Sequence, residues 1–302
     1  MQSEAAVPLS VIVGTTQPWP EIAVCLDSIH DQAREVGAEI LAVDGHGDGF
    51  PPDVATRYPQ LTTMCLPGAS IFQMRAQAML RARGEVVAVT EDHCCVAPDW
   101  CRQIVTAHRD WPEAAVVGGI VENGSCDRLL DWAHFVAVNG PSMPPVPNGE
   151  HGKVALQASV SYKRSVLPKE FPAWGYMEWM LNQQLREQGH KLVSDDRIVV
   201  SHIQSFSLAE ACAIHYHDSR SIAGFRSKQI GLGERMLRLG VAVTAMTPLL
   251  VLRSMAPLIE KRRKLELLVL GLPHFVILAI CRAAGAAVGF IAGEGDSPRQ
   301  IR

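Results

Sequence analysis

The sequence has little of what marks a nucleic-acid-binding, secreted or disulfide-rich protein. Its 28 Lys and Arg against 31 Asp and Glu give a net charge of −3, which excludes a strongly basic surface for nucleic acid. The eight cysteines include no C-x-x-C pair, and residues 1–8 lack the basic and apolar regions of a signal peptide. We therefore expect a reduced, cytoplasmic protein with no nucleic-acid partner.

The cysteines leave one alternative open. Cys94, Cys95 and Cys101 lie close together and could form a thiolate site, but ligand spacing is missing, so ordinary buried thiols are the preferred interpretation. With 302 residues, 48% of them apolar, the chain can bury a large core in one large domain or two smaller ones.

The first third of the chain alternates between apolar runs typical of buried strands and segments with helical spacing. Strands are predicted at 9–15, 38–44, 60–65 and 86–90, and helices at 20–37 and 69–83. Because crossover connections are right-handed, the first two strands should be parallel. The pattern predicts an α/β fold, a Rossmann-like sheet flanked by helices.

Polar residues follow these strands where each one ends. Glu91, Asp92 and His93 emerge at a carboxyl end, where ligands bind in open α/β sheets, and oxygen ligands with one imidazole suit Mg²⁺ or Mn²⁺. The alternative is a polar strand end that opens a loop. Asp44 precedes the glycine-rich stretch 45–49, so it could accept hydrogen bonds from a ribose or base, or simply cap that turn. Arg75 should start near the crevice, where a guanidinium can pair with phosphate.

The order of these pieces resembles the family 2 glycosyltransferases, which have a nucleotide-sugar-binding α/β fold of the GT-A type. The resemblance covers roughly residues 8–220 and rests on the segments Leu9–Thr15, Val43–Gly45, Gly68–Gly84 and Thr90–His93, which look like the family's first strand, acidic turn, arginine-bearing helix and D-x-D-type metal motif. Two departures stand out: Glu91 replaces the usual first aspartate, and His93 stands where a second acid is common.

The resemblance implies a division of labour along the chain. Residues 1–230 would be the catalytic domain, with a nucleotide-sugar-binding half at 8–93 and an acceptor-binding half at 94–220. The implied metal ligands for Mn²⁺ or Mg²⁺ are Asp92, His93 and His202, although His202 could equally be a structural histidine at a strand end. The residues implied to bind the donor are Thr15, Asp44, Arg75, Glu91, Asp92 and Arg220.

A second informative stretch, 175–189, is predicted to be a helix with the buried stripe Met177, Leu181 and Leu185. It resembles the family's glutamate-aspartate helix, which implies that Glu178 is the catalytic base, while Met177 replaces the preceding acid. An inverting transfer needs one carboxylate to take the acceptor's proton. The alternative is that Glu178 only favours the helix dipole. Residues 140–152, rich in proline, are predicted to be a lid or a plain surface loop.

The character of the chain changes after about residue 230. The apolar stretches 237–259 and 265–291 are both interrupted by charged residues or prolines, so neither is a clean membrane span, and the basic cluster 261–264 lies between them. Some bacterial members of the resembled family carry a similar tail. We expect residues 231–302 to be a membrane-associating helical region, with 237–292 contacting the membrane surface and anionic headgroups. Two helices packed on the catalytic core or in a dimer interface are the alternative.

These observations predict a metal-dependent inverting glycosyltransferase at the cytoplasmic face of the membrane. It would move a sugar from a nucleoside diphosphate to a lipid-linked or saccharide acceptor. A sugar-nucleotide nucleotidyltransferase fits less well, because the loop 14–21 lacks basic residues. His93 and Met177 stand where the family has acidic residues. A non-catalytic, membrane-bound nucleotide-sugar-binding or scaffold protein is therefore an alternative.

Overall fold

The computed structural model describes residues 7–150 and 158–301, which fall into two compact units. Unit 1 comprises the chain up to Glu122 and residues 141–203, and unit 2 comprises residues 123–140 and 204 onward. Each unit is therefore built from segments that are not contiguous in the sequence.

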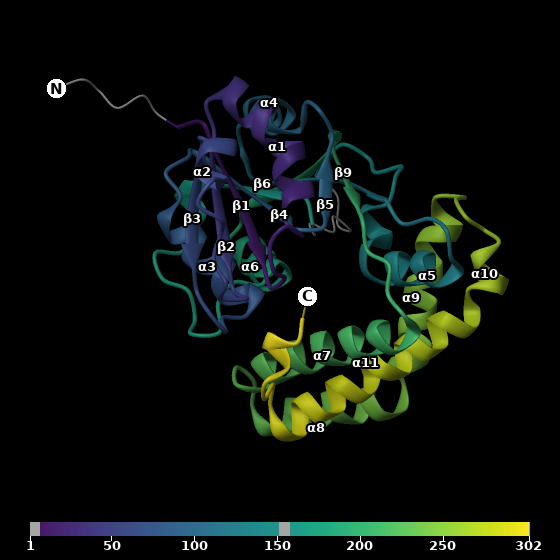
Figure 1. Ribbon diagram of the computed structural model, residues 1–302. Helices are drawn as coiled ribbons and strands as arrows, with labels where there is room; N and C mark the ends of the chain where they lie inside the picture. The colour runs from purple at the N-terminus through teal and green to yellow at the C-terminus, as the bar shows by residue number, and fades with distance from the viewer. Residues whose placement is uncertain (1–6, 151–157, 302) are drawn as a thin grey trace. The chain divides into compact units, whose positions relative to one another are not determined.

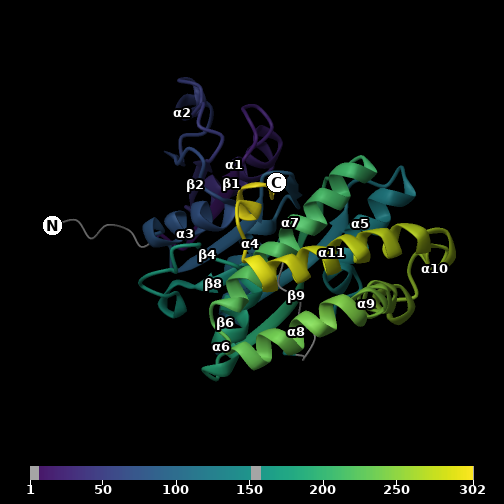
Figure 2. The same cartoon turned by 90° about the horizontal axis from the view of Figure 1, so that it is seen from below.

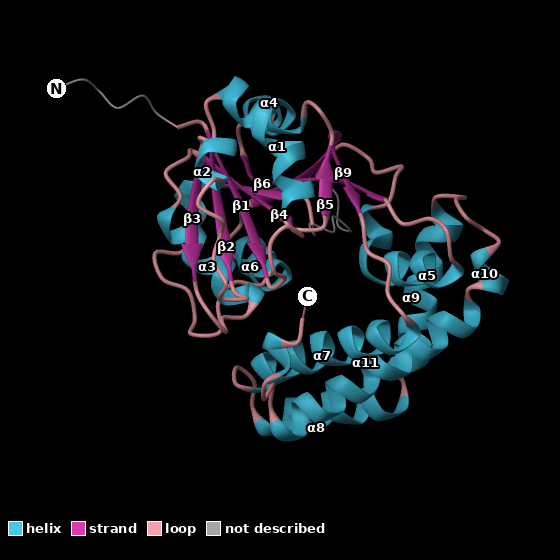
Figure 3. Ribbon diagram, viewed as in Figure 1, coloured by secondary structure: helices cyan, strands magenta, loops and turns pink. Residues whose placement is uncertain are grey.

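Unit 1 is built on a nine-stranded mixed sheet (Figures 1 and 3). The strand order is β3-β2-β1-β4-β8-β6-β9-β5, with β7 paired to β9. The strands are β1 (Leu9–Thr15), β2 (Glu39–Asp44), β3 (Leu61–Cys65), β4 (Val86–Glu91), β5 (Cys94–Val96), β6 (Ala114–Asn123), β7 (Gly149–Glu150), β8 (Val160–Lys163) and β9 (Lys191–His202).

The predicted parallel strands are confirmed. In β1, Thr15 pairs with Asp44 of β2 and Gly14 pairs with Glu91 of β4, so the three strands run parallel and their polar ends meet at one edge of the sheet. The residues of β1 and β2 are all buried, as expected for strands covered on both faces. The predicted α/β fold of the GT-A type, a mixed sheet flanked by helices, is thus present.

The helices described in unit 1 are α1 (Ala23–Val36), α2 (Val54–Arg57), α3 (Ile71–Arg81), α4 (Trp100–Asp110) and α6 (Glu178–Glu187). Their ends follow local rules. Gly37 closes α1 in the left-handed conformation, which glycine adopts without steric cost. Ser70 and Gln73 form a capping box that begins α3. Helix α1 packs against α4 (Figure 1).

Strands β5, β7 and β8 were not foreseen from the sequence. Strand β8 lies antiparallel between β4 and β6, and β5 pairs with the end of β9. In the predicted lid, residues 140–142 form a 3₁₀ turn and β7 pairs with β9. Residues 151 and 152 of that loop lie outside the described residues, and its role as a lid stays a prediction.

Unit 2 is helical, and Figure 2 shows its long helices. It contains α5 (Leu129–Asn139), α7 (Leu208–Ser227), α8 (Leu232–Thr244), α9 (Met246–Glu260), α10 (Leu267–Leu270) and α11 (Leu272–Ala292). Helix α11 packs against α5, α7, α8 and α9, so it is the core of this unit. In the described part of the chain, α11 is the single helix long and apolar enough to cross a membrane by itself, while α8 and α9 pass that test only as a pair bent by 72°.

The predicted boundary at residue 230 falls inside unit 2, between α7 and α8. Truncation of the chain at residue 230 would remove α11, which packs against α7 and α5, and would expose the apolar faces of these two helices. Experiments on the tail therefore call for point substitutions in the full chain, and the division into a catalytic domain and a membrane-associating region stays a prediction.

Candidate active site

Three metal-capable side chains converge where β4 and β9 end. The Glu91 Oε2 atom lies 3.2 Å from His93 Nε2 and 3.2 Å from His202 Nε2. The two imidazole Nε2 atoms are 3.1 Å apart. Glu91 and His202 are 111 residues apart in the sequence. Together with His93 they place one oxygen and two nitrogen donor atoms around a common point.

Asp92 lies on the other side of the His93 ring. Its Oδ1 is 2.8 Å from His93 Nδ1, and its Oδ2 accepts a hydrogen bond of 2.6 Å from the Thr15 hydroxyl. Asp92 therefore orients the imidazole and Thr15 orients Asp92, an arrangement often found behind metal-bound histidines. The sequence assigned Asp92 to the metal and Glu91 to the donor; in the structure, Glu91 is the carboxylate that faces both Nε2 atoms.

The charges of this cluster are strongly coupled. Burial would raise the pKa of Glu91, but hydrogen bonds from His202 and His93 and the charge of Arg75 hold it well below its usual range. Burial opposes a proton on His93, yet Asp92 and Glu91 raise its pKa to about 9. Burial lowers the pKa of His202, with the hydrogen bond to Glu91 opposing. The carboxylates thus keep the His93 imidazole protonated and cationic. A bound metal cation could supply the same positive charge.

The donor set fits a divalent metal ion. Glu91 and His93 also form a group with Cys94 in which one ligand atom of each lies within 4.8 Å of the others. Burial raises the pKa of the Cys94 thiol well above its usual value, with the charge of Glu91 adding to the effect. A neutral thiol is a poor ligand, whereas one carboxylate and two imidazoles form the mixed oxygen and nitrogen set that suits Mn²⁺.

Arg75 joins this cluster to the predicted base. Its Nη1 donates to Glu178 Oε1 at 2.6 Å, and its Nη2 donates to Glu91 Oε1 at 3.2 Å. The arginine is only 5% exposed. Although burial lowers the pKa of Arg75, the charges of Glu178 and Glu91 raise it above its ordinary value, so it stays cationic. The predicted contact of Arg75 with donor phosphate stays a prediction, since both ends of its guanidinium hold carboxylates here.

The start of α6 is fixed tightly against α3. Gly175 has a φ of +101°, and a Cβ there would lie 2.2 Å from the Phe72 carbonyl oxygen, so only glycine fits. The Tyr176 backbone N–H donates to the same oxygen at 2.9 Å. Two residues later, α6 begins at Glu178, and this close approach sets the position of its carboxylate.

A buried tyrosine pair next to Glu178 was missed by the sequence analysis. The Tyr162 and Tyr176 hydroxyls are 2.8 Å apart, and the Tyr162 hydroxyl donates to Asn182 Oδ1 at 3.0 Å. Burial raises the pKa of Tyr176 well above its usual value, and the charge of Glu178 adds to the effect. Tyr162 lies on β8, the short strand that the sequence did not reveal, so its role could not be foreseen.

The two remaining predicted donor-binding residues have structural contacts. The Asp44 carboxylate accepts from the backbone N–H groups of His46, Gly47 and Gly49, which is the turn-capping alternative. Arg220 belongs to unit 2, on α7, and its Nε donates to the Gly293 carbonyl at 3.2 Å. Donor binding by these two side chains stays a prediction.

Comparison with known proteins now identifies the family. The family model described as "Glycosyl transferase family 2" matches residues 10–169, more than half of the chain. The chain belongs to glycosyl transferase family 2. The predicted family, and with it the predicted enzyme class of glycosyltransferases, is confirmed at this level.

Individual relatives support the family and the fold. The putative glycosyltransferase EpsH of Bacillus subtilis (strain 168) is 25% identical over 130 residues, which are 42% of this chain and 37% of that protein. This chain therefore matches little more than a third of the length of that curated relative. The structure of the mannosyltransferase PcManGT from Pyrobaculum calidifontis, in complex with GDP-Man and Mn²⁺, superposes with a TM-score of 0.56 at 18% identity. That likeness covers 94% of this chain and 87% of PcManGT, and it shows the fold.

Proposed function

We propose that the protein is a metal-dependent inverting glycosyltransferase that transfers a sugar from a nucleoside-diphosphate donor to a lipid-linked acceptor at the cytoplasmic face of a membrane. Family membership supports glycosyl transfer. The GDP-Man and Mn²⁺ bound by PcManGT support a nucleotide-sugar donor and a divalent ion for this family member. A saccharide acceptor is the alternative to a lipid-linked one.

One observation carries the catalytic part of the proposal. A single buried guanidinium, that of Arg75, holds the candidate base Glu178 with one arm and the candidate ligand Glu91 with the other. The base and the metal-type cluster come from α6, β4 and β9, and Arg75 fixes the distance between them. A helix-end charge that only favours the dipole would not need this buried partner.

The cluster at the end of β4 would hold the metal ion. Glu91, His93 and His202 offer the donor atoms, and Asp92 and Thr15 keep the His93 ring in place. When bound, a divalent ion supplies positive charge that stabilises a departing diphosphate. His93 must lose its Nε2 proton to act as a ligand.

Glu178 would act on the acceptor. Its carboxylate takes the proton of the acceptor hydroxyl while the hydroxyl oxygen forms the bond to the anomeric carbon from the face opposite the leaving group. The bond between that carbon and the donor's phosphate oxygen breaks, its electron pair leaves with the nucleoside diphosphate, and the configuration inverts. Arg75 keeps Glu178 oriented for this step, and the start of α6 against Phe72 fixes its backbone.

The membrane part of the proposal rests on unit 2. Sixteen of the nineteen exposed large apolar side chains of the described residues lie there, most of them on α8, α9 and the segment up to α11. Residues 231–302 carry ten Lys and Arg against five Asp and Glu, in a chain whose net charge is −3. An apolar surface with excess positive charge suits the anionic cytoplasmic leaflet, which is the side where nucleotide sugars are available.

The decisive test is Glu178→Gln in the full-length protein. Glutamine keeps the shape but cannot accept the proton, so turnover with Mn²⁺ should fall about 10²- to 10⁴-fold while donor affinity stays nearly unchanged. Turnover is followed by release of nucleoside diphosphate, and donor affinity by calorimetry. Glu187→Gln, at the far end of the same helix, is the matched control and should keep normal turnover.

Two results would contradict the proposal. Near-normal turnover of Glu178→Gln removes Glu178 as the base. Donor binding by the unmodified protein without transfer, across lipid-linked and soluble acceptors, favours the non-catalytic scaffold protein instead.

A further inference from the structure

Unit 2 contains a polar cluster that the proposed glycosyl transfer does not use. It lies among α5, α7 and α11, which pack against one another. The Arg282 Nη1 atom, from the middle of α11, donates to the Ala137 carbonyl of α5 at 3.3 Å, and its Nη2 lies 3.4 Å from Asp218 Oδ2 of α7. The rings of His134 on α5 and His215 on α7 stack edge to face, 5.1 Å between centroids.

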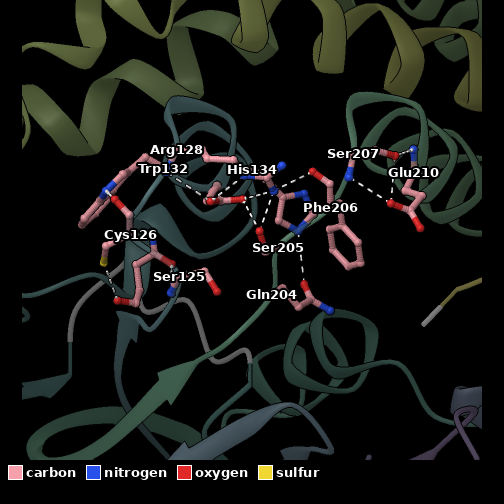
Figure 4. A network of polar contacts seen from close by, with 12 residues as sticks. Ser125, Cys126, Arg128, Trp132, His134, Gln204, Ser205, Phe206, Ser207 and Glu210 are labelled. Atoms are coloured by element: carbon pink, nitrogen blue, oxygen red, sulfur yellow. Dashed lines mark hydrogen bonds and ion pairs between the residues drawn. The ribbon is translucent and has the colours of Figure 1, made fainter.

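One wall of the cluster is held rigidly. Figure 4 shows His134 Nε2 next to Gln204, with an Nε2 to Oε1 distance of 3.2 Å. In the same view, Arg128 donates to the Ser205 hydroxyl at 2.5 Å and to the Phe206 carbonyl at 2.8 Å. The segment that leads into α7 is thereby tied to α5, so the two histidines do not depend on a loose loop for their position.

Two buried polar atoms, one of Arg282 and one of His215, lack a partner among the residues that the structure describes. They are the Arg282 Nε and the His215 Nε2, both shielded from solvent. His215 is only 2% exposed, and a buried donor or acceptor without a partner has a free-energy cost. A ligand that accepts hydrogen bonds from this side would remove that cost.

The charge of the cluster is not balanced either. Arg253 of α9 makes no hydrogen bond or ion pair within 7–150 and 158–301, and the positive charge that acts on it most is that of Arg282. The Asp218 carboxylate lies 3.4 Å from Arg282 Nη2, a distance longer than a good charge-assisted hydrogen bond. Burial also raises the pKa of Asp218, which weakens it as a counter-ion. Within the described residues, Arg282 thus has one long contact with a carboxylate and Arg253 has none.

The cluster opens toward an apolar surface. Exposure increases from His215 to the Arg282 side chain, 21% exposed, and to the exposed Arg253. On α9, Arg253 follows Leu249 and Leu252, which are 55% and 64% exposed. Leu252 and Arg253 are three and four residues beyond Leu249, so both lie next to Leu249 on the helix surface. The arginine thus lies beside side chains that a lipid tail could cover.

We propose that Arg282, Arg253 and His215 form a binding site for a phosphate group at the apolar surface of unit 2. A guanidinium can donate two parallel hydrogen bonds to two phosphate oxygens. One phosphate can accept hydrogen bonds from both arginines at once. The site takes the phosphate of a membrane lipid or of the lipid-linked acceptor. Binding of the acceptor rests on the proposed function, whereas binding of a membrane lipid does not depend on it.

The test uses the full-length protein and vesicles of phosphatidylcholine that contain either phosphatidic acid or oleic acid at equal negative charge. At constant ionic strength, the unmodified protein should prefer the phosphatidic acid vesicles in a sedimentation assay. Arg253→Gln and Arg282→Gln should each weaken this preference about fivefold, as expected from about one charge contact at a membrane surface. Arg238→Gln is the matched control, because Arg238 on α8 is already paired with Glu234.

Asp218→Asn gives a result of the opposite sign. It removes the carboxylate that competes with phosphate for Arg282, so binding to phosphatidic acid should become several-fold tighter. If Asp218 and Arg282 were only a structural ion pair, this variant would lose thermal stability and gain no affinity. Because Arg253 is exposed, Arg253→Gln should fold normally, which keeps the test decisive even if Arg282→Gln does not fold.

Competition with inorganic phosphate tests whether the phosphate group alone occupies the site. Displacement from the vesicles by millimolar phosphate shows that the site takes the phosphate group itself, and resistance to it shows that the lipid is required; both support the site. Equal binding to both vesicle types, or an equal loss in Arg238→Gln, overturns it. Donor binding with Mn²⁺ is measured on the same variants and should not change, so failure here is distinct from failure of the glycosyl-transfer proposal.

Discussion

The two units of this protein treat charge and apolar surface in opposite ways. In unit 1, the buried guanidinium of Arg75 is matched by Glu178 and Glu91, and the His93 imidazolium by Asp92 and Glu91. Apolar side chains there are almost all covered. In the described part of unit 2, Arg253 has no ion pair and Arg282 has a long one with Asp218, and many large apolar side chains face solvent.

This difference indicates which kind of ligand each unit is suited to bind. In unit 1 the charged side chains neutralise one another and are held in position. Such a network suits a small ligand that must be placed precisely. An uncovered apolar surface with spare positive charge is incomplete by itself and suits a large anionic and apolar surface. Three further experiments probe this contrast.

The strongest effect should come from the network in unit 1. Arg75→Met removes one buried cation and leaves Glu178 and Glu91 with repelling, uncompensated charges, which should lower the free energy of unfolding by about 3 kcal/mol. Urea denaturation measures the loss. Arg81→Met, one and a half turns along the same helix at an exposed position, should change stability by less than about 0.5 kcal/mol. Equal effects of the two substitutions would show that the buried network adds nothing.

The apolar surface of unit 2 should matter for membranes and not for folding. Replacing Leu249 and Leu252 together by serine should weaken binding to anionic vesicles by more than about tenfold, since each leucine buried in lipid contributes roughly 1.5–3 kcal/mol. Thermal stability should change little, because both side chains are exposed. Leu80→Ser, at an exposed site of unit 1, should leave vesicle binding unchanged. If all three proteins bind vesicles alike, the α9 surface is not the membrane contact.

A smaller effect is expected from a buried histidine in unit 1. The Ser161 hydroxyl donates to the Val117 carbonyl, so His108 must donate to Ser161 through its Nε2–H, 2.9 Å from the hydroxyl oxygen. Its Nδ1 is then the unprotonated nitrogen, and within the described ranges it has no hydrogen-bond partner. Burial, with the charge of Lys163, lowers the pKa of His108 to about 4.

Stability should therefore fall as the pH is lowered. Between pH 6.5 and pH 4, the unfolded chain binds a proton at this histidine and the folded chain does not, so acid favours unfolding. From pH 7 to pH 5 the loss should be about 2 kcal/mol. His108→Gln should reduce the pH dependence by that amount, whereas the exposed His190→Gln should not. An unchanged slope in His108→Gln would contradict the assigned neutral state.

What the sequence could reveal followed local chemistry. Strands β1, β2 and β4 were predicted because parallel strands buried on both faces consist of continuous apolar runs. The stripe of Met177, Leu181 and Leu185 was predicted from helical spacing, and all three residues are buried, although α6 begins at Glu178 and not at residue 175.

What the sequence could not reveal depends on contacts between distant segments. Strand β8 has four residues and is stabilised by pairing with β4 and β6, which no local pattern shows. Arg75 and Glu178 are 103 residues apart, and the contacts of residues 173–176 with Phe72 and Gln73 help to bring them together.

The position of α5 has a consequence for synthesis of the chain on the ribosome. Helix α5 ends at Asn139, but α11, which covers it, is complete only at Ala292. At 5–20 residues per second, the nascent chain carries the uncovered Trp132, Phe135 and Val136 for roughly 8 to 30 seconds. During that interval these side chains are available to chaperones or to an incorrect partner. Co-translational folding of this protein therefore cannot proceed one unit after the other, because the helical unit begins before the sheet is finished and closes last.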